Sequence, residues 1–156
     1  MSIDLIQEKM RNAYVNIWIG EVWNKGNVNF VDSIFHPDFE DHRPIPQFPG
    51  NVEGHKLMAA DWHQAFPDVV FNIEDVIIQG NLLAARYVAE GTHTGVILGI
   101  QGTGVPVSLT GIDIFGFENG LVRHWWHEED FDTFIKPILT ADAERKKESN
   151  LGRRGL

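Results

Sequence analysis

The sequence predicts an α+β fold in which helices from the first half of the chain cover one face of a strongly bent antiparallel sheet. Apolar residues recur at helical spacing up to Pro67, and from Val69 onward runs of β-branched and aromatic residues alternate with turn signals. The 156 residues are 43% hydrophobic, which suffices for one domain with its own core. We expect that domain to span residues 1–140, followed by a polar, basic and mobile tail over 141–156.

Three helices are expected before the sheet. The first begins near the N-terminus and ends at Gly26, because apolar residues recur there on one helical face. The second is short, runs through Phe35 and ends at Pro37, and the third ends at Pro67, since a proline disfavours helical backbone in the residue before it. Prolines also predict a loop over residues 44–49.

The second half of the chain predicts four antiparallel strands. They are expected at residues 69–79, 82–94, 105–117 and 121–127. The turn signals Gly80-Asn81, Thr103-Gly104 and Asn119-Gly120 predict hairpin connections between them. A short last helix through Phe131, Phe134 and Ile138 is expected to close the sheet. Glycines within the strands allow a sharp bend, so the sheet can curl around a cavity that the helices cap.

The composition argues against several kinds of site and partner. The chain has no cysteine, which excludes disulfides, thiolate metal sites and cysteine nucleophiles. Its formal net charge of −9 argues against a nucleic-acid partner, although the basic segment 141–156 could be a nucleic-acid arm rather than the frayed end that we favour. No stretch has the length needed to span a bilayer, and no signal-like segment opens the chain. We expect a soluble, cytoplasmic protein without a membrane partner.

The most unusual polar residue is Asp113, in the apolar strand segment GIDIFGF. Side chains alternate along a strand, so Asp113 should share a face with Phe115 and Phe117, opposite Ile112 and Ile114. A carboxylate in such surroundings is costly unless it is paired, hydrogen-bonded or protonated. Asp113 is therefore a candidate catalytic group, and the alternative is a core carboxylate satisfied by its neighbours.

Five segments carry a resemblance to a known family. They are FHPDFEDH, EGHKLMAADWHQAFPD, EGTHTGVILGIQGTGVPV, GIDIF and NGLVRHWWHEEDF. In this order and spacing, over about residues 5–135, they resemble the SnoaL-like polyketide cyclases of the nuclear transport factor 2-like superfamily. The resemblance implies a cone-shaped, cystatin-like α+β barrel with an open apolar pocket and no cofactor. Because this superfamily includes cyclases, isomerases, hydrolases and binders, the resemblance specifies the fold more closely than the reaction.

The resemblance also implies where a site would lie. The working positions of aromatic-polyketide cyclases carry asparagine, histidine and aspartate, and the matching residues here are Asp41, Asp113 and His127, with the histidine and aspartate exchanged. In the related ketosteroid isomerases, Asp41 matches the base and Asp113 the neutral acid that donates a hydrogen bond to the enolate oxygen. Their oxyanion-hole tyrosine falls near Ile19, and Tyr14 is more than a turn earlier, so this tyrosine is expected to be missing.

Further expectations concern the neighbours of this site. The hairpin after GIDIFGF should place Asp113 beside the strand of His127. His124 and His127 should lie on opposite faces with no partner cluster, so no metal site is expected. Asp41 could also simply cap a turn, and His127 could be a structural rim residue. The expected substrate-binding residues are Trp18, Trp62, Phe115, His42 and Trp125.

The leading functional hypothesis is an enzyme that acts on a hydrophobic, polyketide-like carbonyl compound by enolisation and aldol-type ring closure, or by isomerisation. Asp113 would be the general acid or oxyanion donor, Asp41 the base or substrate orienter, and His127 the proton relay. The rivals are a small-molecule binder without turnover and a protein-interaction module. A homodimer is expected through an apolar outer sheet face, which should contain Val107, Leu109, Ile112 and Ile114.

Overall fold

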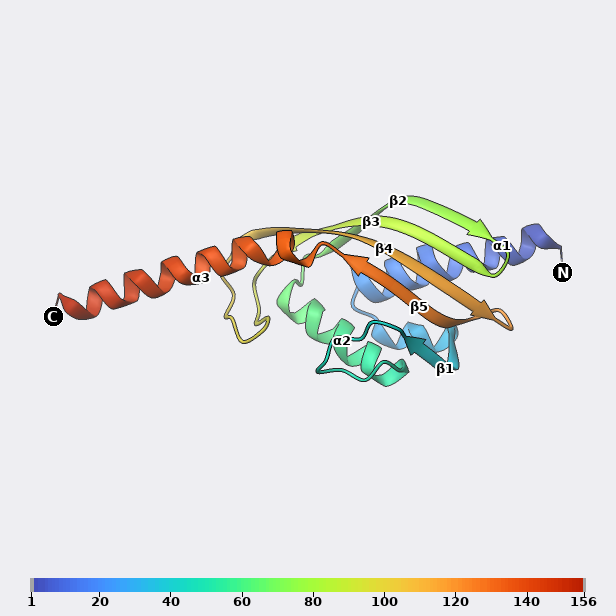
Figure 1. Cartoon of the computed structure of the whole chain (residues 1–156), viewed down its shortest axis with the longest axis horizontal. Helices are drawn as coiled ribbons and strands as arrows, with labels where there is room; N and C mark the ends of the chain where they lie inside the picture. The colour runs from blue at the N-terminus through green and yellow to red at the C-terminus, as the bar shows by residue number, and fades with distance from the viewer. Residues whose placement is uncertain (1, 156) are drawn as a thin grey trace.

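The computed structural model describes residues 2–155 and contains one five-stranded sheet. Its strands are β1 (Phe35–Asp41), β2 (Val70–Gln79), β3 (Leu82–Thr92), β4 (Pro106–Glu118) and β5 (Leu121–Glu129). The order across the sheet is β1-β5-β4-β3-β2, with antiparallel pairing from β2 to β5 and β1 parallel to β5 at the edge (Figure 1). The predicted mixed α+β fold with an antiparallel sheet is confirmed.

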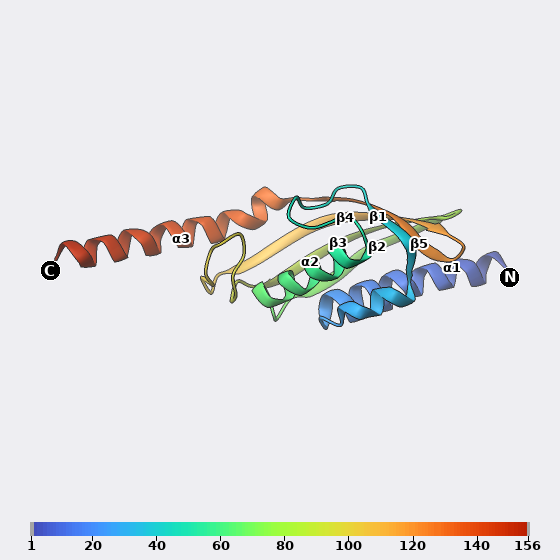
Figure 2. The same cartoon turned by 90° about the horizontal axis from the view of Figure 1, so that it is seen from below.

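Helices that precede β2 in the chain lie on one face of this sheet, and α3 follows β5 and extends beyond the sheet (Figure 2). The helices of the described chain are α1 (Ile3–Asn12), the π-helix η1 (Ala13–Asn24), the 3-10 helix η2 (Val28–Ser33), α2 (Val52–Ala65) and α3 (Phe131–Arg154). Asn51 begins α2 by accepting a hydrogen bond from the amide of Gly54, and Asp130 begins α3 in the same way from Thr133. The first helix of the sequence prediction is thus α1 and η1 in succession, and the third is α2.

Burial along β4 alternates with a period of two, as predicted for Asp113. Asp113 and Phe115 are buried on the face that meets the helices, whereas Ile112 and Ile114 are 49% and 36% exposed on the outer face. Val107 and Leu109 are also buried on the inner face, so the expectation that they belong to the outer face is wrong. The reason is parity, because both lie an even number of residues from Asp113 in an unbroken stretch of strand.

The largest departure from the sequence prediction is β1. The helix expected through Phe35 is only the short η2, and Phe35 already begins the edge strand. A residue near a proline favours extended backbone, and an edge strand tolerates Pro37 because one of its sides needs no ladder hydrogen bonds. Consequently β1 carries Asp41 alongside Trp125 of β5.

Two other connections differ from expectation. β3 and β4 are joined by residues 93–105 rather than by a tight turn at Thr103-Gly104. The closing helix α3 is 24 residues long instead of short, and it extends away from the sheet through the segment expected to be a tail (Figure 1). The mobility of residues 141–156 stays a prediction. None of the helices in the described part of the chain combines the length and hydrophobicity that a bilayer crossing requires.

Candidate active site

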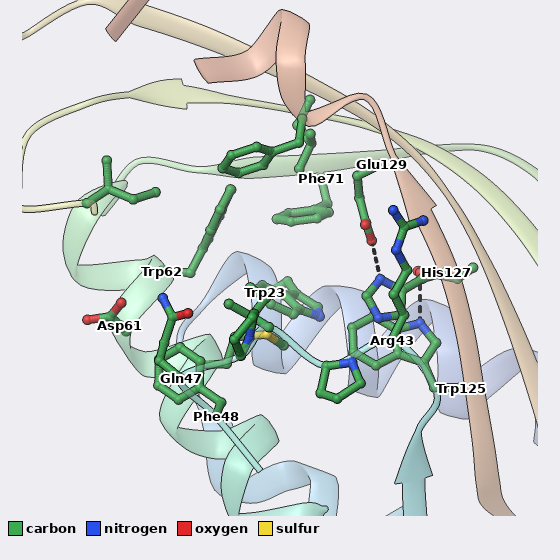
Figure 3. Close-up of a pocket in the computed structure, with 18 of the residues that line it drawn as sticks. Trp23, Arg43, Gln47, Phe48, Asp61, Trp62, Phe71, Trp125, His127 and Glu129 are labelled. Atoms are coloured by element: carbon green, nitrogen blue, oxygen red, sulfur yellow. Dashed lines mark hydrogen bonds and ion pairs between the residues drawn. The ribbon is translucent and has the colours of Figure 1, made fainter. Parts of the chain in front are cut away.

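A cavity of about 450 Å³ lies between the sheet and the helices. Its lining is mainly aromatic and aliphatic and includes Trp18, Trp23, Phe48, Met58, Trp62, Phe71, Leu109 and Trp125 (Figure 3). These residues come from η1, the proline-rich loop, α2, β2, β4 and β5. The expectation of a cavity between the sheet and the helices is confirmed. Aromatic walls of this kind suit a flat, apolar ligand.

Asp113 lines the cavity and is 2% exposed. The Tyr14 hydroxyl donates to its Oδ2 at 2.8 Å, and the Trp125 indole N–H donates to its Oδ1 at 2.9 Å. Burial raises the pKa of Asp113 to about 6, although both hydrogen bonds favour the anion and act in the opposite direction. Asp113 therefore exchanges its proton near neutral pH.

Tyr14 reaches this site, contrary to the expectation that it lies too far away along the first helix. It belongs to η1, where hydrogen bonds span one residue more than in an α-helix, so the helical spacing used for the prediction does not apply. Its ring packs edge-on against Phe115, with centroids 5.2 Å apart. The hydroxyl donates its hydrogen bond to Asp113. Burial, and to a smaller extent the negative charge of Asp113, raises the pKa of Tyr14, so Tyr14 remains a neutral donor.

His127 is held between two carboxylates. Its Nε2 lies 2.9 Å from Oδ1 of Asp41. Its Nδ1 lies 2.6 Å from Oε1 of Glu129 (Figure 3). Burial alone would lower the pKa of His127, but hydrogen bonds and charges from Asp41 and Glu129 raise it to about 9. The ring also stacks on Trp125, with centroids 3.7 Å apart. At neutral pH His127 is therefore an imidazolium that donates from both nitrogens.

Asp41 lies behind His127 rather than in the cavity wall. Its Oδ1 also accepts the backbone N–H of Arg43 at 2.9 Å, and its own amide donates to the carbonyl of Gly50 at 2.9 Å. The start of the proline-rich loop thus fixes the carboxylate. Asp113 lies beside the strand of His127, as expected from the hairpin, and the register makes these two residues cross-strand partners. Asp41 contacts His127 from β1.

Glu129 and Tyr87 also line the cavity, and neither was among the site residues predicted from the sequence. Gly111 lies between them across the sheet, opposite Tyr87 on β3 and Glu129 on β5. A Cβ at Gly111 would lie 2.3 Å from the Tyr87 hydroxyl oxygen, so only glycine allows this tyrosine to cross the strand. Burial, and to a smaller extent the charges of Asp113 and Glu129, raises the pKa of Tyr87, so Tyr87 stays a neutral donor. Strand alternation would have found Glu129, which follows His127 by two residues.

The expected substrate-binding residues divide into two groups. Trp18, Trp62 and Trp125 line the cavity. Phe115 is fully buried behind Trp18, and His42 lies on the outer face, so neither is part of the lining. His42 follows Asp41 by one residue at the end of β1 and therefore points to the opposite side of the sheet. There it meets His124, in a cluster that is separate from the cavity.

Comparisons with known proteins agree with this fold. The family model described as "SnoaL-like polyketide cyclase" matches residues 12–136. TsrD from Streptomyces laurentii is 25% identical, with a TM-score of 0.72 over 88% of this chain and 97% of that one. IdmH from Streptomyces antibioticus is 24% identical, with a TM-score of 0.68 over 84% and 96%. A SnoaL-like polyketide cyclase from Agrobacterium tumefaciens is 18% identical, with a TM-score of 0.67 over 83% and 97%.

Among curated proteins, none matches this chain. The family model nevertheless spans η1, η2, α2, the whole sheet and the start of α3, which together enclose the cavity and its polar wall. The chain therefore belongs to the SnoaL-like polyketide cyclase family.

Proposed function

We propose that this protein catalyses the cofactor-independent enolisation of an apolar, polyketide-like carbonyl compound, followed by aldol-type ring closure or isomerisation. The observation that carries the proposal is the meeting of Asp113, His127 and Glu129 at one wall of a mainly apolar cavity. Two titratable groups with pKa values of about 6 and about 9, set apart by their surroundings, are typical of an acid/base site.

Exposure suggests how the roles divide. The side chain of Glu129 is 22% exposed, whereas those of His127 and Asp41 are each 6% exposed. Of the two carboxylates that hold His127, Glu129 is therefore the one that a bound substrate can touch, and it is the base in this proposal. His127 relays the proton and Asp41 orients His127 without touching the substrate. This moves the role of base from Asp41 to Glu129.

The proposed steps balance without a co-reactant. Glu129 removes a proton from the carbon next to a substrate carbonyl, and the electrons of the broken C–H bond form the enolate. Protonated Asp113 and the neutral Tyr87 hydroxyl are the donors available to the enolate oxygen. In ring closure the enolate carbon bonds to a second carbonyl carbon. The oxygen of that carbonyl then takes the proton that Glu129 removed.

A second candidate function is ligand binding without turnover. It is favoured by one observation: both oxygens of Asp113 and both ring nitrogens of His127 already have hydrogen-bond partners in the protein. A site so fully satisfied could serve only to hold a rigid, aromatic-lined cavity.

Enolisation can be tested without the natural substrate. The probe is 2-tetralone, a bicyclic ketone with acidic α-protons, and the measurement is its rate of hydrogen–deuterium exchange in D₂O, followed by NMR. The protein should accelerate exchange over buffer, and Glu129→Gln and Asp113→Asn should each slow it by about a hundredfold or more. The matched control is Asp75→Asn, since Asp75 pairs with Arg86 on the outer face and should not affect exchange.

Binding is measured in parallel by quenching of tryptophan fluorescence with 2-naphthol, a planar analogue of the enolate. Binding of the naphthol without any acceleration of exchange would favour the binder. Acceleration that survives both Glu129→Gln and Asp113→Asn would refute the roles proposed for these carboxylates.

A further inference from the structure

The outer face of the sheet carries a second cluster of chemically active side chains, separate from the cavity. Glu40 lies near the end of β1, His42 directly follows that strand, and His124 is the partner of Glu40 on β5. The two strands are neighbours in the sheet (Figure 1). His42 Nε2 and His124 Nδ1 lie 2.9 Å apart, and one ligand atom from each of the three residues lies within 4.8 Å of the others. The cluster could not be predicted from the sequence, because its formation depends on the unpredicted strand β1.

We propose that Glu40, His42 and His124 bind a divalent transition-metal ion of borderline softness, with Zn²⁺ as the best match. Two imidazoles and one carboxylate are a frequent protein ligand set for such ions. At metal–ligand distances of about 2.0–2.2 Å, tetrahedral ligand atoms are about 3.4 Å apart. The two histidine nitrogens therefore need to separate by only about half an ångström.

The imidazole rings are already held in place. The His42 ring stacks on Trp126, with centroids 4.8 Å apart and ring planes 8° apart, and the His124 ring stacks on the same indole at 5.2 Å and 29°. Stacking removes much of the rotational freedom that ligands otherwise lose when they bind a metal. The third ligand, Glu40, is exposed and can turn to complete the site.

One neighbouring charge opposes the ion. The guanidinium of Arg123 lies 3.9 Å from Glu40, and it also lies 3.8 Å from Glu118, which offers it a second carboxylate once Glu40 turns to the metal. The acidic chain, with a net charge of −9, favours cations at its surface. A bound ion would link β1 to β5. The link would lie next to Asp41, which precedes His42 and contacts His127.

The test uses the tag-free, full-length protein and ZnCl₂ alone. Isothermal titration calorimetry should show one Zn²⁺ per chain, and Co²⁺ should give the visible absorption bands of a four- or five-coordinate nitrogen–oxygen site. His42→Ala and His124→Ala should each weaken Zn²⁺ binding at least tenfold. The matched control is His36→Ala, which removes a histidine from the same strand outside the cluster and should leave binding unchanged.

Thermal unfolding supplies a second readout, because Zn²⁺ should raise the melting temperature of the wild type but not that of His42→Ala. Lack of Zn²⁺ binding by the folded wild type at millimolar concentration overturns the proposal. Binding that persists unchanged in both histidine variants does so as well. Neither result bears on enolisation, because the cluster faces away from the cavity.

Discussion

Replacement of Asp113 by asparagine should stabilise the protein at neutral and alkaline pH. The folded state raises the pKa of Asp113 from 3.8 to about 6, because burial disfavours its charged form. Between these two values the folded state holds a proton that the unfolded state has lost, so rising pH destabilises the fold. The difference of about two pH units corresponds to about 3 kcal/mol, which is fully expressed above about pH 6.5.

Asparagine resembles the protonated form of Asp113 in size and polarity. Its oxygen can accept from the Trp125 indole, and its amide can donate to the Tyr14 hydroxyl oxygen, since a hydroxyl both donates and accepts. Asp113→Asn therefore keeps both contacts and removes the cost of burying a charge. At pH 8 it should be more stable than the wild type by up to about 3 kcal/mol, or about 6–12 °C in melting temperature for a chain of this size.

The assay is urea and thermal unfolding of both proteins from pH 4 to pH 8. Groups other than Asp113 titrate in both proteins, so their contributions cancel in the difference between the two stabilities. That difference should be small at pH 4, about half developed at pH 5 and complete above pH 6.5. Asp75→Asn, on the outer face, should change stability by less than about 1 kcal/mol at every pH.

A loss of stability in Asp113→Asn at pH 8, or a difference that does not vary with pH, would refute this reasoning. Asp113 would then be a structural carboxylate whose anion the fold needs. Gain of stability combined with loss of exchange activity would instead indicate a functional residue kept at a cost to the fold.

Three other outcomes follow from the site and the sheet. NMR should show that His127 stays protonated up to about pH 9, and Glu129→Gln should lower its pKa because one of the two carboxylates is removed. Tyr14→Phe removes a hydrogen bond to a charged group, worth about 1.5–3 kcal/mol, so the pKa of Asp113, read from its carboxyl ¹³C shift, should rise above 6 by about one to two pH units. Light scattering should show a homodimer at micromolar concentration that Ile112→Lys disrupts, because Ile112 is exposed on the apolar outer face; a monomeric wild type would contradict this.

Local patterns predicted the parts of the fold that depend on short-range periodicity. Alternation along GIDIFGF placed Asp113 on the buried face, and the Asn119-Gly120 turn placed it opposite the strand of His127. Where alternation was applied without attention to parity, as for Val107 and Leu109, the prediction failed.

The remaining site contacts arise from features without a local signature. The segment of β1 has few residues and contains Pro37, so its strand character depends on pairing with β5, about 85 positions later in the chain. The π-helical backbone of η1 changes which side chains share a face, and it brings Tyr14 to Asp113 across 99 residues of sequence. Such contacts are set by tertiary packing.

The chemistry of the site follows from how its charges are distributed. His127 carries one positive charge between Asp41 and Glu129, so these three groups together hold one net negative charge beside Asp113 at neutral pH. When Glu129 takes the substrate proton, its negative charge passes to the enolate, so the net charge is unchanged but now lies on the oxygen that Asp113 contacts in a poorly solvated space. Like charges favour protonation of the group whose pKa is nearest the ambient pH, and that group is Asp113. Formation of the enolate would therefore itself favour the protonated form of Asp113, the donor that the enolate oxygen requires.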